Sequence, residues 1–263
     1  MRIRRKSILP LVRIYIDIHH PDPLKPACYA AILHYGYQID TIRMASGANK
    51  LKDVRHLIWD IDGTLYKSTP DLIEAIRHET YKRIATGLNI SYEEARRKFL
   101  ILYDKLGGAT ATTVQLGLGR DLIQQAVDSV DKSRYVKSDP QLQDMFKVTL
   151  RDFTHVIVTN TSRQGTIRTL EILGLSRDLF LAMVTADDVL RSKPDTEPFE
   201  RVLKATGDPA GQHVSIGDRE KVDIAPAKTL GMKTIFVWGT SQLADASAST
   251  VYDVPSVLKR WKY

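Results

Sequence analysis

The sequence has little of what a disulfide framework or a membrane anchor requires. Cys28 is the single cysteine among 263 residues, which excludes an intramolecular disulfide and favours a reducing, cytoplasmic location. His19, His20 and His34 do not stand at zinc-site spacings from Cys28, so a zinc site is not expected. The apolar runs are no longer than strands, so we expect no membrane-spanning segment. The arginine-rich start lacks the apolar core and small-residue cleavage site of a secretory signal.

Positive charge is concentrated at the front of the chain. The formal net charge is +7, but residues 1–55 contain ten basic and four acidic residues, which leaves +1 for everything that follows. Because no basic stripe with interleaved aromatic residues follows, we expect neither a nucleic-acid partner nor a membrane partner. Residues 8–18 could form a strand and residues 27–35 a short helix. We expect residues 1–52 to be a basic extension that is disordered or precedes a true start at Met44.

The stretch from His56 to Tyr66 places two acids after a short apolar run. The Leu-Ile-Trp run has the composition of a buried strand, and Asp60 and Asp62 point to the same side of an extended chain. The carboxyl ends of strands are where open α/β sheets bind ligands, and two clustered carboxylates require a cation or a shared proton. A calcium loop is excluded because Leu65 and Asp71 stand where that loop needs glycine and glutamate. A solvated turn is the remaining alternative.

The chain between this stretch and residue 150 contains helical patterns and no evident strand. Helices are predicted from residue 70 to 86, from 91 to 106, near 120–130 and over 139–149. The small and polar residues 110–117 are not predicted to be regular. We therefore expect an all-helical module over residues 68–149.

A second strand candidate, residues 155–158, ends at Thr159 and Asn160. A helix is predicted over residues 163–173 directly after it. A hydroxyl and free backbone N–H groups at a helix N-terminus can bind a phosphate oxygen. A lone threonine at such a place is more often an N-cap.

A lysine and two aspartates complete the set of candidate site residues. Lys193 precedes a proline after a short strand candidate, where a surface loop is the plain interpretation. Asp218 follows a strand candidate at residues 213–216, and Asp223 stands five residues further on. A helix that runs to Leu230 is predicted after Asp218, and another strand over residues 233–237. Asp218 by itself could be a turn residue or a helix cap.

Together these motifs resemble those of the haloacid dehalogenase (HAD) superfamily of phosphatases. The resemblance covers about residues 55–263, and its motifs follow the family's order. It implies an α/β fold, a Rossmann-like parallel sheet with helices on both faces, in which residues 53–67 and 150–263 form the core and residues 68–149 an inserted helical cap. The matching positions are Asp60, Asp62, Gly63 and Thr64, then Thr159, then Lys193, then Asp218 and Asp223.

The resemblance also implies a mechanism that depends on Mg²⁺. In the family's scheme Asp60 attacks phosphorus, and a protonated Asp62 donates to the leaving oxygen and then activates water. Asp62 would contact the metal through its backbone carbonyl. An acid at position 62 disfavours the dehalogenases and the transport ATPases of the family. The implied metal ligands are Asp60, Asp62 and Asp218, with Asp223 supporting them, and the implied phosphate-binding residues are Thr159, Asn160 and Lys193.

The substrate implied is a small phosphate monoester. The motif sequences look like those of the branch that holds pyrimidine 5′-nucleotidases, and phosphoglycolate phosphatases share the helical cap. A phosphosugar mutase would use the same four motifs. A non-catalytic HAD domain, acting as a binding module, is the other alternative, which the presence of every motif acid disfavours. The sequence does not indicate an oligomeric state.

Overall fold

The structure, a computed structural model, describes residues 54–106 and 108–262. The strand, the helix and the start at Met44 expected in the front of the chain lie outside these residues. In the described part of the chain no helix is both long and apolar enough to cross a membrane.

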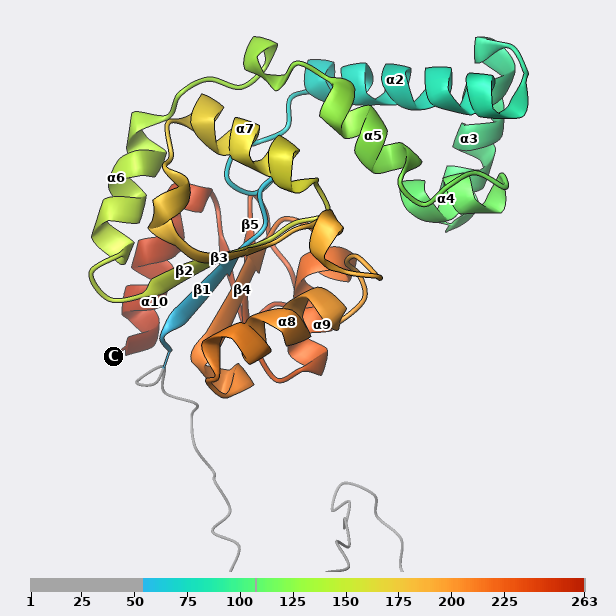
Figure 1. Cartoon of the computed structure of the whole chain (residues 1–263). Coiled ribbons are helices and arrows are strands. Elements are labelled where there is room, and N and C mark those ends of the chain that lie inside the picture. Colours follow the sequence, from blue (N-terminus) through green and yellow to red (C-terminus); the bar gives the residue numbers. More distant parts are fainter. Residues whose placement is uncertain (1–53, 107, 263) are drawn as a thin grey trace, which may run out of the picture. The chain divides into compact units, whose positions relative to one another are not determined.

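A six-stranded parallel sheet forms the centre of the fold (Figure 1). Side chains alternate between the two faces of a strand, and in the central strand Leu57 and Trp59 join one apolar cluster while Ile58 joins another. Both faces are therefore buried, as a parallel sheet requires. In their order across the sheet the strands are β3 (Phe180–Val184), β2 (Thr154–Val158), β1 (His56–Trp59), β4 (His213–Gly217), β5 (Lys233–Val237) and β6 (Ala246–Ala248).

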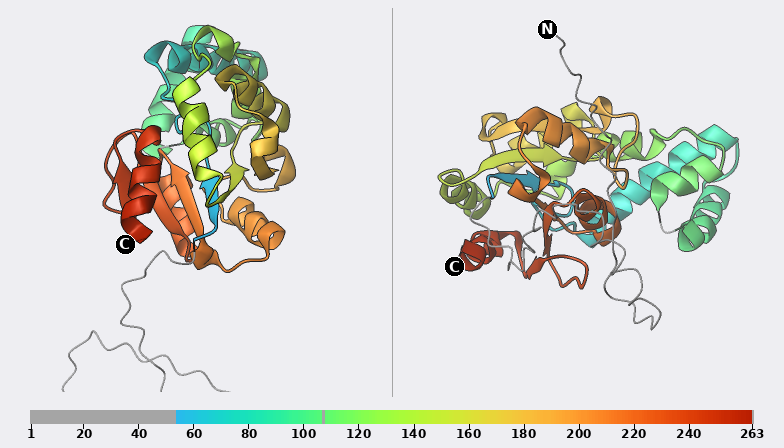
Figure 2. Two further views of the ribbon diagram at one scale, coloured as in Figure 1. Left: turned by 90° about the vertical axis from the view of Figure 1, so that its left-hand side faces the viewer. Right: turned by 90° about the horizontal axis from the view of Figure 1, so that it is seen from below.

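Helices cover both faces of the sheet, which confirms the predicted fold class. Apolar side chains of α6, α7 and α10 pack in the cluster of Leu57 and Trp59, and those of α8 and α9 pack in the cluster of Ile58. The C-terminal helix α10, red in Figure 2, contacts β6. The helices are α6 (Pro140–Thr149), α7 (Arg163–Leu173), α8 (Glu197–Thr206), α9 (Ala225–Thr229) and α10 (Val254–Lys262).

The segment between β1 and β2 is helical, and most of it has an apolar cluster of its own. This cluster is built around Tyr81, Ile84 and Phe99. By contrast, Phe146 of α6 packs against the sheet with Trp59, so α6 belongs with the core although it lies inside the predicted module 68–149. The helices are α2 (Pro70–Leu88), α3 (Tyr92–Leu106), α4 (Ala109–Gln115), α5 (Leu122–Ser129) and the short η3 (Lys132–Arg134).

The ends of these helices follow their local sequence. Thr69 caps α2 by accepting from the N–H of Leu72, and Ser162 caps α7 by accepting from the N–H of Gly165, which satisfies donors that a helix start leaves free. Gly174 ends α7 in the left-handed region, with φ 74°. Local hydrogen-bonding chemistry thus sets where the site-bearing helix α7 begins.

Short helical turns connect the longer elements. Residues 220–224 form a π-helix, a form that is often found at functional sites, where the sequence predicts one ordinary helix. The turns are η4 (Arg177–Leu179), η5 (Ala186–Asp188), η6 (Ala210–Gln212), the π-helix η7 (Glu220–Ile224) and η8 (Val251–Asp253).

Candidate active site

The strand order fixes where the site lies. Successive strands run outward from β1 through β2 to β3 on one side, and from β4 through β5 to β6 on the other. The carboxyl ends of β1 and β4 therefore border the switch point at which doubly wound sheets bind ligands. Asp60 follows β1 and Asp218 follows β4. The N–H of Asp60 donates to the carbonyl of Ile216 at 3.1 Å, which continues the pairing of the two strands to the site.

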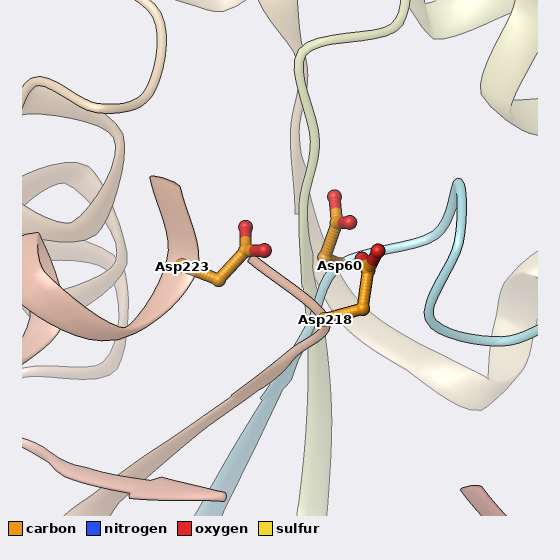
Figure 3. A group of neighbouring side chains, drawn as sticks. All are labelled: Asp60, Asp218 and Asp223. Carbon is orange, nitrogen blue, oxygen red and sulfur yellow. The ribbon is translucent and has the colours of Figure 1, made fainter. Parts of the chain in front are cut away.

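Three carboxylates meet at this switch point. Asp60, Asp218 and Asp223 each offer an oxygen within 4.8 Å of the others, and Figure 3 shows Asp223 reaching toward the other two from η7. The hydroxyl of Thr64 lies 2.9 Å from Asp218 Oδ1 and 3.3 Å from Asp60 Oδ2. An all-oxygen donor set of this kind fits a hard divalent cation such as Mg²⁺.

Two glycines make room for these acids. Gly63 has φ +95°, and a Cβ there would lie 2.6 Å from Asp218 Oδ2. A Cβ at Gly217 would lie 2.3 Å from the Cβ of Asp223. A side chain at either position would therefore push the neighbouring aspartate out of place, and at Gly63 the backbone conformation also disfavours one.

Lys193 joins two of the carboxylates. Its Nζ donates to Asp60 Oδ1 at 2.8 Å, to Asp223 Oδ1 at 2.6 Å and to the carbonyl of Val158 at 2.9 Å. The Lys193 side chain is only 1% exposed. A buried ammonium is tolerable when it is paired and hydrogen-bonded in this way.

Burial and crowding change the pKa values of these groups. Burial, together with the charges of Asp60 and Asp223, raises the pKa of Asp218 to about 6. Burial also raises the pKa of Asp60, although Lys193 opposes it. Burial lowers the pKa of Lys193, but the charges of Asp223 and Asp60 outweigh burial and raise it overall. The acids of the cluster are thus short of positive charge, which favours cation binding.

A second cation lies at the edge of the cluster. The guanidinium of Arg219 stands 3.9 Å from Asp60 Oδ2 and 3.9 Å from Asp223 Oδ2, and its side chain is 47% exposed. Lys193 and Arg219 together leave the three carboxylates with one uncompensated negative charge when all are ionised. A divalent cation would reverse the sign of the site and prepare it for an anionic group.

The carboxylate of Asp62 lies apart from the acid cluster. Its Oδ1 accepts from Lys132 Nζ at 2.6 Å and from the hydroxyl of Tyr66 at 2.5 Å, and its Oδ2 accepts from the hydroxyl of Thr161 at 2.5 Å. Burial raises the pKa of Asp62, but the charge of Lys132 and these three hydrogen bonds lower it to about 2. Asp62 is therefore ionised here, whereas the family scheme led us to expect a proton on it.

The predicted phosphate-binding residues lie between β2 and α7. Thr159 is buried, and its hydroxyl accepts from the N–H of Thr161 at 3.2 Å. The side-chain amide of Asn160 donates to the carbonyl of Lys193 at 2.7 Å, which joins this loop to the lysine. Asn160 Oδ1 is buried and accepts no hydrogen bond from the described residues. The structure thus brings Thr159, Asn160 and Lys193 together, and their roles stay predictions.

Some residues of the site escaped the sequence reasoning. Tyr66, Thr161 and Arg219 stand inside the motifs, but nothing in their spacing assigns them a role. Lys132 stands outside every motif, in a charged segment of the kind that is normally exposed to solvent.

Comparison with known proteins identifies the family. Residues 57–237 match the family model described as haloacid dehalogenase-like hydrolase. The chain belongs to the haloacid dehalogenase-like hydrolase family. The HAD resemblance is confirmed, and with it the prediction of a HAD-type phosphoric monoester hydrolase.

Curated HAD relatives match over most of their length. A glyceraldehyde 3-phosphate phosphatase of Methanocaldococcus jannaschii is 27% identical over 197 residues, covering 69% of this chain and 84% of the relative. A phosphoglycolate phosphatase of Mesorhizobium japonicum is 23% identical over 189 residues, covering 69% of this chain and 81% of the relative. The crystal structure of a HAD phosphatase from Thermococcus onnurineus has a TM-score of 0.58 at 23% identity, covers 78% of this chain and 98% of that one, and supports the fold.

Proposed function

We propose that this protein is a Mg²⁺-dependent phosphatase that hydrolyses a small phosphate monoester through a phosphoryl group carried on Asp60. The observation that carries the proposal is the environment of Asp60. Its carboxylate is buried at the switch point, 2.8 Å from Lys193 Nζ and within 4.8 Å of oxygens of Asp218 and Asp223. A fixed, desolvated carboxylate beside cations is suited to attack phosphorus.

The chain's own residues account for the two chemical steps. Asp60 attacks phosphorus, the bond to the leaving oxygen breaks, and that oxygen takes a proton from Asp62. Asp62, now ionised, takes a proton from the water that attacks the aspartyl-phosphate, and phosphate leaves. Lys193 and the N–H groups at the start of α7 offset the charge of the phosphoryl group. Mg²⁺ held by Asp60, Asp218 and the carbonyl of Asp62, with Asp223 beside them, would supply further positive charge.

The ionised state of Asp62 in this structure suits the second step. The first step needs a proton on the same carboxyl group. An incoming phosphate brings negative charge close to Asp62, and a nearby negative charge raises the pKa of a carboxyl group. Binding of the substrate dianion would therefore favour proton uptake by Asp62 before the leaving group departs.

Helices α2 to α5 would act as the cap that selects the leaving group. They have their own apolar cluster, and Gln124 of α5 contacts Asp187 beyond β3 at 3.3 Å. We place the end of the cap before α6, because α6 packs with the sheet. A cap of this kind excludes water and contacts the part of the substrate that differs between esters.

The substrate class proposed is a small phosphate ester, such as a nucleoside monophosphate. The relatives named for phosphoglycolate and for glyceraldehyde 3-phosphate support a small, anionic organic phosphate. These relatives make phosphoglycolate a second ester to be tested beside the nucleotides.

The test is phosphate release from a panel of nucleoside monophosphates, phosphoglycolate and sugar phosphates, with Mg²⁺ and with a chelator. Wild type is compared with Asp60→Asn, and Asp104→Asn on α3 serves as the matched control at an exposed aspartate. We expect metal-dependent release that Asp60→Asn abolishes and Asp104→Asn leaves unchanged. Conversion of a sugar phosphate to its isomer without release would show a mutase instead. Absence of either reaction in a folded, Mg²⁺-binding protein would refute the proposal.

A further inference from the structure

Lys132 is a buried lysine that no sequence motif explains. Among the lysines of residues 54–106 and 108–261, Lys132 and Lys193 are buried. Lys193 serves the acid cluster, whereas Lys132 comes from η3, between α5 and α6. Its neighbour Arg134 is 76% exposed on the same short helix. Burial of an ammonium group is unfavourable unless a partner compensates it, so the position of Lys132 requires a specific partner.

That partner is the acid of the proposed proton transfers. Lys132 Nζ lies 2.6 Å from Asp62 Oδ1 and 3.3 Å from the hydroxyl of Thr169 on α7, and the Lys132 side chain is 7% exposed. The backbone carbonyl of Lys132 also accepts hydrogen bonds from the N–H groups of Tyr135 and Val136, which fixes the turn that follows the lysine. The lysine thus connects the turn at residues 131–136 to the carboxylate of Asp62.

The three donors to Asp62 differ in what they can supply. Tyr66 and Thr161 donate through neutral hydroxyls. Among the described residues that hydrogen-bond to this carboxylate, Lys132 is the one with a positive charge. Charge-assisted hydrogen bonds are roughly twice as strong as neutral ones. Lys132 is therefore the contact that contributes most to holding the Asp62 carboxylate in its present direction.

We infer that Lys132 is a positioning residue, which fixes the Asp62 carboxylate by an ion pair and couples the segment 131–136 to it. The role in turnover rests on the proposed function. Lys132 has no hydrogen bond or ion pair to Asp60, Asp218 or Asp223 among those of the described residues. It therefore acts through Asp62, on the rate of the chemical steps and not on phosphate binding.

A double-mutant cycle tests this role. We expect Lys132→Met to lower kcat by about tenfold to a hundredfold, the usual effect of losing a supporting partner, with KM changed by less than about threefold. Lys132→Arg should restore part of kcat. In an Asp62→Asn background Lys132→Met should have almost no further effect on kcat, because its partner is already lost. Lys137→Met is the matched control, since Lys137 is an exposed lysine directly after this segment. Its ammonium group donates to the carbonyl of Ser133 and not to Asp62.

Two results would contradict the proposed role of Lys132. A full kcat loss from Lys132→Met in the Asp62→Asn background would mean that Lys132 acts directly on the substrate, and the inference would be wrong. An unchanged kcat in Lys132→Met would also overturn it.

A second measurement does not depend on turnover. Hydrogen exchange of the amides of residues 131–136 should become faster in Asp62→Asn, because the lost ion pair ties Lys132 to a position 70 residues away in the sequence. Exchange in α8, which lacks this contact, should stay unchanged. Unchanged exchange in residues 131–136 would refute the coupling. If wild type released phosphate from no ester, the proposed function would fail while this experiment still decided the inference.

Discussion

Replacing Lys193 by methionine removes the buried cation that donates hydrogen bonds to two buried carboxylates. Methionine keeps the length of the side chain but loses the contacts of Nζ with Asp60, Asp223 and the carbonyl of Val158. Asp60 and Asp223 would then face each other without their shared hydrogen-bond donor, in a place where both are nearly inaccessible to water. The half-exposed Arg219, 3.9 Å from each, would be the cation left beside them. The variant therefore tests whether the site is organised by this lysine.

The expected loss of stability follows from the burial of the pair. Breaking a buried ion pair by removing one partner costs about 3–5 kcal/mol, because the remaining charge is left uncompensated. Protonation of Asp60, whose pKa is raised by burial, would relieve the repulsion, so the loss should shrink as the pH falls. Added Mg²⁺ should also reduce the loss, because a cation that binds the folded state stabilises it by mass action.

Urea unfolding at neutral pH, with Mg²⁺ and with a chelator, measures both effects. Lys204→Met is the control, because it removes an exposed lysine of α8 and should change the free energy of unfolding by less than about 0.5 kcal/mol. A loss below about 1 kcal/mol in Lys193→Met, the range of an exposed ion pair, together with no effect of Mg²⁺, would refute the reasoning. Phosphate release by Lys193→Met at the wild-type rate would refute the role of Lys193 in the reaction.

Two further predictions concern Gly63 beside the acid cluster and the buried His155 of β2. Gly63→Ala should raise the Mg²⁺ concentration needed for half-maximal activity, since its Cβ would displace Asp218. Gly207→Ala is the control, because Gly207 has φ +72° and a Cβ there would meet nothing within 4 Å. It reproduces only the backbone strain and should leave that Mg²⁺ concentration unchanged. Burial lowers the pKa of His155 to about 4. Below pH 6.5 His155 therefore binds a proton in the unfolded chain but not in the folded chain. The free energy of unfolding should fall by up to about 3 kcal/mol between pH 6.5 and 4. Unfolding curves of wild type and His155→Gln over this range measure the effect, and parallel pH dependences would contradict it.

The sequence predicts the helices and strands that are determined by their own residues. It misses those that form only through contacts with distant parts of the chain or that lack a hydrophobic pattern. Strands β1, β2, β4 and β5 are short apolar runs, and α7 has a serine cap and a terminal glycine, so each was predictable within a few residues. Strand β6 is an Ala-Ser-Ala segment that becomes a strand by pairing with β5. Helix α4 is built mostly of alanine and threonine, with no apolar periodicity to indicate it.

The same distinction applies to the site. Asp60, Asp218 and Lys193 could be predicted because each directly follows a strand or precedes a proline in a known order of motifs. The π-helix η7, which carries Asp223 toward Asp60, has no sequence signature and was expected as an ordinary helix. The ion pair of Lys132 with Asp62 depends on how two distant segments pack, so no pattern within either segment could predict it.

The separation of the two aspartates shows how one strand end can support two chemical roles. Asp60 faces other carboxylates, and burial with the Asp223 charge raises its pKa, so it depends on Lys193 and a cation to stay ionised. Asp62, two residues on, faces Lys132, Tyr66 and Thr161, which lower its pKa to about 2 against the effect of burial. Two acids that are separated by one residue in the sequence thus respond to different partners. The carboxylate of Asp60 can attack phosphorus only while Lys193 and a cation compensate the negative charges of Asp218 and Asp223. The pKa of Asp62, in contrast, is raised by burial and lowered mainly by Lys132, which lies outside every motif.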